Sequence, residues 1–270
     1  MKFAFFGTPY VARDTLTALL ERGFTPSMVI TNPDAPRGRG MALTPSPTKT
    51  LAEERGIPVL TPTKLDTETI ESIKSFGCEY AVVVAYGKIL PDELISTFPR
   101  GVLNVHYSLL PKYRGASPVE SALLAGDTVT GVAIQKMVRE MDAGEVLALT
   151  EVPIDPEETA KELKPRLIKM GAALLVDTLP KFIEGRIAGT PQDAAQVTRA
   201  RKIKKEDGLI DPEGSARENW NKYRAYAEWP GIYFFKDAKR IKITKARLEG
   251  EKFIIERVIP EGKAEMPYSG

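Results

Sequence analysis

Short, continuously apolar stretches that alternate with helical patterns are the strongest constraint on how the first half of this chain folds. These stretches lie at residues 2–7, 27–31, 57–60, 80–85 and 101–106. Strands buried on both faces are apolar throughout, and parallel strands need a long crossover connection, usually a helix. The alternation therefore predicts an α/β domain with a doubly wound parallel sheet. In such sheets a ligand binds beyond the C-terminal ends of the strands.

The second half of the chain predicts a change of domain. Its expected elements are a helix at 118–125, strands at 129–137 and 145–152, a helix at 159–184, and short strands at 231–235, 240–246 and 252–258. The sequence between the long helix and the short strands is polar and has no clear apolar period. We therefore expect the α/β domain over 1–188, a basic linker over 189–206 and a small β-rich domain over 207–270. We expect Trp220 and Trp229 in the core of this last domain.

The rare residue types exclude several kinds of site. The chain has one cysteine, Cys78, which excludes an internal disulfide and a multi-cysteine zinc site. It has one histidine, His106, which excludes a His-rich metal site and leaves one imidazole for chemistry. We expect Cys78 to be a buried small residue rather than a nucleophile, and we expect no metal ion.

Hydropathy and charge together describe a globular protein with local basic segments. The apolar run at residues 3–6 is too short for the core of a signal peptide, and no run is long enough to span a membrane, so we expect a cytoplasmic protein. The net charge is only +2, but basic residues gather at 33–49, 199–205 and 236–247. Such runs are often only solvated surfaces. Segregated charge can also form a surface that attracts RNA.

Asn104 and His106 are the leading candidates for chemistry. They end the apolar strand at 101–106, and the alternation of side chains along a strand puts them on the same side. An amide can stabilise an oxyanion and an imidazole can move a proton, which suits acyl transfer. Asp142, in a glycine-containing loop, is the leading candidate for the carboxylate that orients the imidazole. The alternative is a structural histidine, but a strand end followed by a Leu-Leu-Pro turn favours the chemical role.

The segment at residues 32–49 reads as a long exposed loop beside the expected site. It contains four prolines and two glycines, and Arg37 and Arg39 both adjoin glycine, which lets the backbone approach a phosphate chain closely. A plain surface insertion is the alternative, although long loops in compact domains are usually functional or disordered. The Gly-Thr-Pro at residues 7–9 lacks the later glycines of a G-x-G-x-x-G pattern, so the sequence does not indicate an NAD site.

Two motifs carry a resemblance to a known family. The first is Asn104-x-His106-x-Ser108-Leu109-Leu110-Pro111-x-x-Arg114-Gly115, with Asp142 downstream. The second is Pro33-Asp34-x-Pro36-x-Gly38-Arg39-Gly40, followed by Pro45-Ser46-Pro47-x-Lys49. Together they resemble the methionyl-tRNA formyltransferases, a branch of the folate-dependent formyltransferases. The second motif is similar to the insertion by which the tRNA-specific branch grips its acceptor stem.

The resemblance implies a fold, an activity and a set of partners. The fold would be a Rossmann-like formyltransferase domain followed by an OB-like C-terminal domain that binds RNA. The protein would be a one-carbon transferase of protein biosynthesis that moves the formyl group of 10-formyltetrahydrofolate, a co-substrate, to the α-amino group of methionyl-initiator tRNA for translation initiation. Asn104, His106 and Asp142 would be the catalytic residues. We expect a monomer without a membrane partner.

The resemblance also implies contact residues. Those for the folate are Tyr86, Gly87, Ile89, Leu90, Ser108, Leu109, Leu110 and Pro111, and those for the tRNA are Arg37, Arg39, Lys49, Lys202, Lys204 and Lys205. The chain departs from the family in two places. Pro212 follows Asp211 where the family often has an aromatic residue, and the C-terminal domain is compact for the family.

Other functions fit parts of the same pattern. A folate-dependent N-formyltransferase could act on another amine, such as an amino-sugar nucleotide, and the tRNA-type loop and basic linker argue against this. A non-catalytic RNA-binding relative would not need the three candidate catalytic residues. A hydrolase that releases formate could use them to activate water, but the extra β-rich domain gives it no obvious use.

Overall fold

The computed structural model describes residues 1–37 and 41–269, and of Arg37 only the backbone. The chain forms two compact units that interleave along the sequence. The first contains Met1–Arg114, Gly131–Glu151 and Leu167–Val197. The second contains Gly115–Thr130, Val152–Arg166 and the chain from Thr198 onward. The expected division at residues 188 and 206 remains a prediction. It treats each domain as one continuous segment, whereas each compact unit contains three separate segments of the chain.

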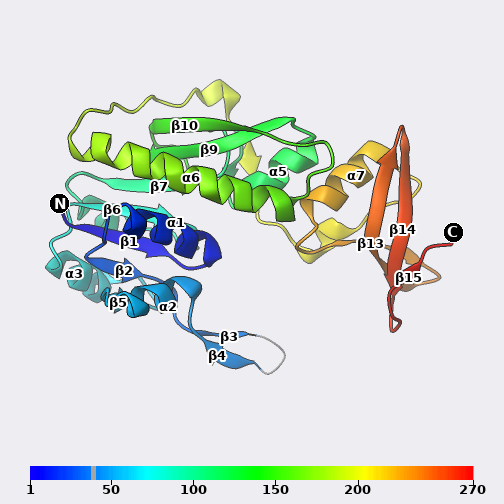
Figure 1. The fold of residues 1–270 in the computed structure, drawn as a ribbon, viewed down its shortest axis with the longest axis horizontal. Coiled ribbons are helices and arrows are strands. Elements are labelled where there is room, and N and C mark those ends of the chain that lie inside the picture. The colour runs from blue at the N-terminus through cyan, green and yellow to red at the C-terminus, as the bar shows by residue number, and fades with distance from the viewer. Residues whose placement is uncertain (38–40, 270) are drawn as a thin grey trace. The chain divides into compact units, whose positions relative to one another are not determined.

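A seven-stranded sheet lies mostly in the first unit (Figure 1). Its order is β10 (Val146–Pro153), β9 (Val129–Lys136), β7 (Val102–His106), β6 (Tyr80–Val84), β1 (Phe3–Gly7), β2 (Met28–Ile30) and β5 (Val59–Leu60). The strands from β7 to β5 pair in parallel, and β9 pairs antiparallel to β7. The doubly wound parallel sheet predicted from the apolar stretches is confirmed, with an antiparallel extension at one edge.

The strand order places the expected ligand-binding edge. The chain runs outward from β1 through β2 to β5 and then returns to β6 and β7 on the other side of β1. Ligands bind at such a reversal, outside the C-terminal ends of the strands. The loops that follow β1, β6 and β7 therefore matter most, and His106 is the last residue of β7.

Local sequence signals mark where several of the connecting helices begin. The helices are α1 (Tyr10–Glu21), α2 (Pro47–Glu54), α3 (Thr67–Ser75), α4 (Asp92–Ser96), α5 (Pro118–Ala125), α6 (Ala160–Ile183) and α7 (Ala216–Ala225). Asp66 caps α3 by accepting a hydrogen bond from the Thr69 N–H, as its sequence position predicts. Ser46 caps α2 by accepting from the Lys49 N–H, and Pro47 occupies the first turn, where its missing N–H costs nothing.

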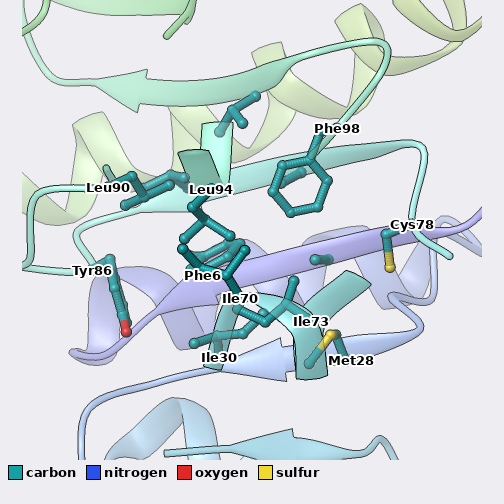
Figure 2. Packing of buried hydrophobic residues seen from close by; sticks show 14 residues of the cluster. Phe6, Met28, Ile30, Ile70, Ile73, Cys78, Tyr86, Leu90, Leu94 and Phe98 are labelled. Atoms are coloured by element: carbon teal, nitrogen blue, oxygen red, sulfur yellow. The ribbon is translucent and has the colours of Figure 1, made fainter. Parts of the chain in front are cut away.

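One hydrophobic core lies between β1, β2 and β6 on one side and α3 and α4 on the other (Figure 2). The ring of Phe6 packs edge-on against Tyr86 and Phe98, with centroids 5.4 and 6.2 Å apart. Truncating such a buried ring to alanine costs about 3–5 kcal/mol. Cys78 is buried in this cluster, as expected, and burial raises the pKa of its thiol. This core holds the strands whose ends carry the site.

The second unit contains an antiparallel sheet of β12 (Ile232–Lys236), β13 (Lys239–Glu249), β14 (Lys252–Pro260) and β15 (Met266–Pro267). Helix α7 packs against α5, and the Asn221 side chain donates to the Leu124 carbonyl at 3.3 Å. Trp220 is buried and donates through Nε1 to the Pro156 carbonyl, as expected for a core residue. The expectation for Trp229 is wrong, because its side chain is 54% exposed.

The polar segment after α6 contains short pieces of structure. These are the 3₁₀ turns Ala194–Gln196 and Lys205–Gly208 and the strand β11 (Arg199–Ala200). In β11, the Ala200 carbonyl accepts from the Ala116 N–H at 2.8 Å. Among the helices of the described chain, none is long and apolar enough to cross a membrane.

Candidate active site at the end of strand β7

Asn104, His106 and Asp142 lie together at the C-terminal end of β7. Asn104 Nδ2 is 3.4 Å from Asp142 Oδ1, and His106 Nδ1 is 3.5 Å from Asp142 Oδ2. His106 is only 5% exposed. One carboxylate therefore faces both the amide and the imidazole. These distances are long for hydrogen bonds, which is common in catalytic sites without a bound substrate.

The Asp142 carboxylate has a closer partner, which the sequence analysis missed. Gln135, on β9, donates from Nε2 to Asp142 Oδ1 at 2.8 Å. Gln135 stands directly opposite Asn104 in the β7–β9 register and is 1% exposed. The available signal was a polar residue directly after the apolar run Val132–Ile134 of a buried strand. A buried amide usually has a specific partner, and here that partner is Asp142.

The second nitrogen of His106 faces a backbone carbonyl. His106 Nε2 is 3.0 Å from the Tyr113 oxygen. A carbonyl only accepts, so this contact requires the hydrogen on Nε2. Nδ1 is then the nitrogen directed at the carboxylate. Tyr113 adopts a φ of +61°, an uncommon conformation for a residue with a side chain. In this conformation its carbonyl oxygen faces His106 Nε2.

The turn after β7 is tightly closed on itself. Ser108 is buried, and its hydroxyl donates to the Lys112 carbonyl at 2.6 Å. Leu110 is also buried, and Leu109 packs against Gly131, where an added Cβ would lie 2.3 Å from Leu109 Cδ2. The predicted folate contacts Ser108–Pro111 thus form one compact turn beside His106. Their role toward a ligand stays a prediction.

In the loop after β6, one of the predicted contact residues exposes its side chain and two have buried side chains. Tyr86 and Leu90 are buried in the core, whereas Ile89 is 77% exposed. The Tyr86 carbonyl accepts from Thr8 Oγ1 at 3.2 Å and from Asn32 Nδ2 at 3.0 Å. If this loop binds a folate, as predicted, Tyr86 and Leu90 contribute through their backbone and Ile89 through its side chain.

The expected loop at 32–49 contains a short hairpin. β3 (Ala35–Arg37) pairs antiparallel with β4 (Ala42–Thr44), and the side chains of Met41 and Leu43 are exposed. Arg39 lies outside the described residues, as does the side chain of Arg37. Lys49 Nζ is 2.9 Å from Asp34 Oδ1, and this hydrogen bond raises the pKa of Lys49.

The predicted tRNA contacts Lys202, Lys204 and Lys205 belong to the second unit and are exposed. Beside them, Asp207 accepts from the Lys204 N–H at 2.7 Å and pairs with Arg201 at 2.6 Å. The hydrogen bond from Arg201 lowers the pKa of Asp207 to about 2. The residues of the described chain form no cluster of three or more His, Cys, Asp or Glu side chains suited to a metal ion.

The arrangement on β7 is suited to acyl transfer. It combines an amide donor, an imidazole and a carboxylate at the edge where ligands of doubly wound sheets bind. An amide can stabilise negative charge that develops on a carbonyl oxygen. An imidazole and a carboxylate in contact can receive and pass on a proton.

Comparison with known proteins agrees with this chemistry. Residues 1–179 match the formyl transferase family, and residues 202–267 match the family's C-terminal domain. A methionyl-tRNA formyltransferase of Thermus thermophilus is 42% identical over 274 residues, which cover 100% of this chain and 88% of that protein.

Two solved structures share the fold. An N-formyltransferase from Helicobacter canadensis, in complex with folinic acid and dTDP-3-aminofucose, matches with a TM-score of 0.72 and 20% identity over 93% of this chain and 89% of that one. The methionyl-tRNA formyltransferase of Clostridium thermocellum matches with a TM-score of 0.64 and 17% identity over 96% and 99%. From its matched domains and its sequence identity to a named member, the chain belongs to the formyl transferase family.

Proposed function

We propose that this protein transfers the formyl group of 10-formyltetrahydrofolate to the α-amino group of methionyl-initiator tRNA. The observation that carries the proposal is the contact of Asn104 and His106 with the Asp142 carboxylate at the end of β7. The acceptor follows from the identity to the Thermus thermophilus protein over the whole chain. Because initiator methionyl-tRNA is the proposed partner, we propose a cytoplasmic location, and we propose that the protein acts as a monomer.

We assign the chemistry of transfer to three side chains. Asn104 offers an amide hydrogen to the formyl oxygen, where negative charge develops as the amine attacks. The His106–Asp142 pair receives the proton that the acceptor amine loses and passes it to N10 of the folate, which leaves as the bond between N10 and the formyl carbon breaks. The Asp142 carboxylate faces Nδ1 of the imidazole. Bound 10-formyltetrahydrofolate supplies the activated formyl carbon on its N10.

The residues present fit a ligand of this kind. Gln135 Oε1 is buried and has no hydrogen-bond partner within the described chain, while its Nε2 is bound to Asp142. A buried acceptor without a protein partner suits a ligand that brings N–H groups to this edge. The folate ring system and the acceptor amine both carry such groups. The exposed Ile89 side chain adds an apolar contact for a flat ring.

The acceptor class separates this proposal from its main alternative. The fold is shared with an N-formyltransferase solved in complex with dTDP-3-aminofucose. The test therefore offers both kinds of acceptor to the purified protein, with 10-formyltetrahydrofolate as donor. We expect formylation of methionyl-initiator tRNA, with much slower reaction of elongator methionyl-tRNA and of a dTDP-amino sugar. Faster reaction of the amino sugar would overturn the tRNA assignment. Folate-dependent release of formate alone would indicate a hydrolase.

A further inference from the structure

Gln192 joins the segment after α6 to the loop that carries Asp142. Its Nε2 donates to the Asp142 carbonyl at 2.8 Å and to the Gly144 carbonyl at 2.7 Å. Its Oε1 accepts from Arg114 Nε at 3.0 Å. The amide thus makes three hydrogen bonds of good length, to residues 48, 50 and 78 positions away.

The chain around Gln192 is anchored independently of these bonds. Two positions earlier, Thr190 exchanges backbone hydrogen bonds with Val146, each 2.9 Å long. One position later, Asp193 caps a 3₁₀ turn by accepting from the Ala195 N–H. The backbone on both sides of Gln192 is therefore held by other bonds, which limits the additional backbone entropy lost when its amide binds the Asp142 loop.

The Asp142 loop needs outside support to keep its shape. Asp142 has a φ of +53°, a conformation that is uncommon for a residue with a side chain. At Gly144 an added Cβ would lie 1.7 Å from the Lys136 carbonyl oxygen, so the loop passes very close to β9. Uncommon backbone conformations persist when the surroundings determine them. Gln192 binds the carbonyls on both sides of Ala143 and so sets the direction of the peptide units beside Asp142.

These contacts close a ring around the imidazole of His106. His106 Nε2 bonds to the Tyr113 carbonyl, and the next residue, Arg114, bonds to Gln192. Gln192 bonds to the backbone of Asp142, whose Oδ2 faces His106 Nδ1. Arg114 is only 8% exposed and lies 3.5 Å from Glu140, in the turn before Asp142. The groups that face the two ring nitrogens are thus connected to each other through Gln192.

We propose that Gln192 is a positioning residue that holds Asp142 against His106, and that Arg114 holds Gln192. The kinetic part of this inference rests on the proposed function, because it is measured as formyl transfer. A displacement of about 1 Å in a catalytic group can lower the rate about 100-fold. Loss of Gln192 should therefore lower kcat and leave the KM values for folate and tRNA nearly unchanged, since Gln192 acts on the protein loop.

The test compares Gln192→Leu, Gln192→Glu and Gln196→Leu in the full chain. Gln196 is the matched control, because its Nε2 bonds to Asp193 in the same segment and not to the Asp142 loop. We expect kcat to fall about 10- to 100-fold in Gln192→Leu, with KM within about 3-fold, and to stay unchanged in Gln196→Leu. Gln192→Glu keeps an acceptor for Arg114 and loses the two donated bonds, so it should be as impaired as Gln192→Leu. Full activity of Gln192→Glu, or a rise in KM alone, would overturn the proposal.

Hydrogen exchange separates this inference from the proposed function. We expect faster amide exchange over residues 139–146 in Gln192→Leu than in wild type or Gln196→Leu, measured by mass spectrometry. Unchanged exchange would overturn the positioning role even in an active enzyme. If the wild-type protein formylates no tRNA, the proposed function fails and the exchange comparison still decides the role of Gln192. If Gln192→Leu does not fold, Arg114→Met provides the same comparison, because it frees the amide that Arg114 holds.

Discussion

Gln135 Nε2 donates a 2.8 Å hydrogen bond to Asp142 Oδ1, which leaves Oδ2 of the same carboxylate toward His106. The contact joins β9 to the loop that follows it, and it is shorter than the contact of Asn104 with the same oxygen. A charged acceptor strengthens such a bond. Gln135 therefore determines which carboxylate oxygen is available to the imidazole.

Substituting Gln135 by leucine should lower activity with little loss of stability. The variant loses the donor to Asp142, so we expect kcat to fall about 10-fold or more. It also removes the Gln135 Oε1 atom, a buried oxygen that lacks a hydrogen-bond partner in the described chain. Because the removal of this oxygen offsets the lost bond to Asp142, the free energy of unfolding should change by no more than about 1 kcal/mol. Steady-state kinetics and thermal unfolding measure the two effects.

Thr130→Val is the matched control for this substitution. Thr130 is buried on the same strand, and its hydroxyl has no partner among the residues that the structure describes. We expect wild-type kcat and equal or slightly higher stability. Equal loss of activity in both variants would mean that the strand, and not the Gln135 amide, supports the reaction.

The substitutions Asn104→Ala and His106→Ala should each slow the chemical step by at least about 100-fold, because each removes a group that stabilises the charge or moves the proton of the reaction. Binding of folate and tRNA should largely survive, since each variant removes one side chain and leaves the turn after β7 closed by the bond from Ser108 to the Lys112 carbonyl. Single-turnover rates at saturating donor measure the effect, and a binding titration with the donor provides the control. A near-normal single-turnover rate in either variant would contradict the assignment.

The ion pair of Lys49 with Asp34 should modulate tRNA binding. Lys49 Nζ is 2.9 Å from Asp34, so Asp34→Asn removes a negative charge and releases the lysine. We expect tighter tRNA binding for Asp34→Asn and weaker binding for Lys49→Ala, with both effects shrinking as salt rises. Lys74→Ala is the control, because Lys74 forms a similar surface pair with Glu71, at 2.7 Å, away from this segment. Equal effects for Lys49→Ala and Lys74→Ala at low salt would exclude a local contact.

Asp207 should make stability depend on pH in the acid range. The Arg201 hydrogen bond lowers its pKa to about 2, below the ordinary value of about 3.9. The pair therefore stabilises the fold above about pH 4 and loses this contribution as pH falls toward 2. Because Arg201 is largely exposed, the contribution is about 1 kcal/mol or less. Asp207→Asn should unfold at a lower temperature than wild type at pH 7, and the difference should shrink steadily below pH 4. A difference independent of pH would contradict the ion pair as its cause.

Much of the first unit follows from local patterns in the sequence. The apolar stretches predict the five parallel strands because a strand buried on both faces needs no polar side. The position of Asn104 and His106 at a strand end follows from the same pattern, and the cap at Asp66 follows from the preference of aspartate for the start of a helix. The hairpin of β3 and β4 was not predicted, because Pro36 and the neighbouring glycines and prolines read locally as a loop.

The parts that could not be predicted depend on residues far apart in the sequence. Trp229 is exposed although tryptophan is usually buried, since its environment is set by packing and not by its own chemistry. The second unit includes 115–130 and 152–166, which no composition signal separates from the first unit.

The sequence by itself determined the parallel sheet, the strand that carries Asn104 and His106, and the choice of Asp142 as their carboxylate. The sheet and the strand follow from side-chain alternation within short stretches, and the choice of Asp142 follows from the need of an imidazole for a carboxylate partner. Only the tertiary structure decided how Asp142 is held, by Gln135 from the neighbouring strand and by Gln192 from a segment 50 residues away that reads locally as a polar linker. A hydrogen bond depends on the distance and direction between two groups, and these are set when the whole chain has folded.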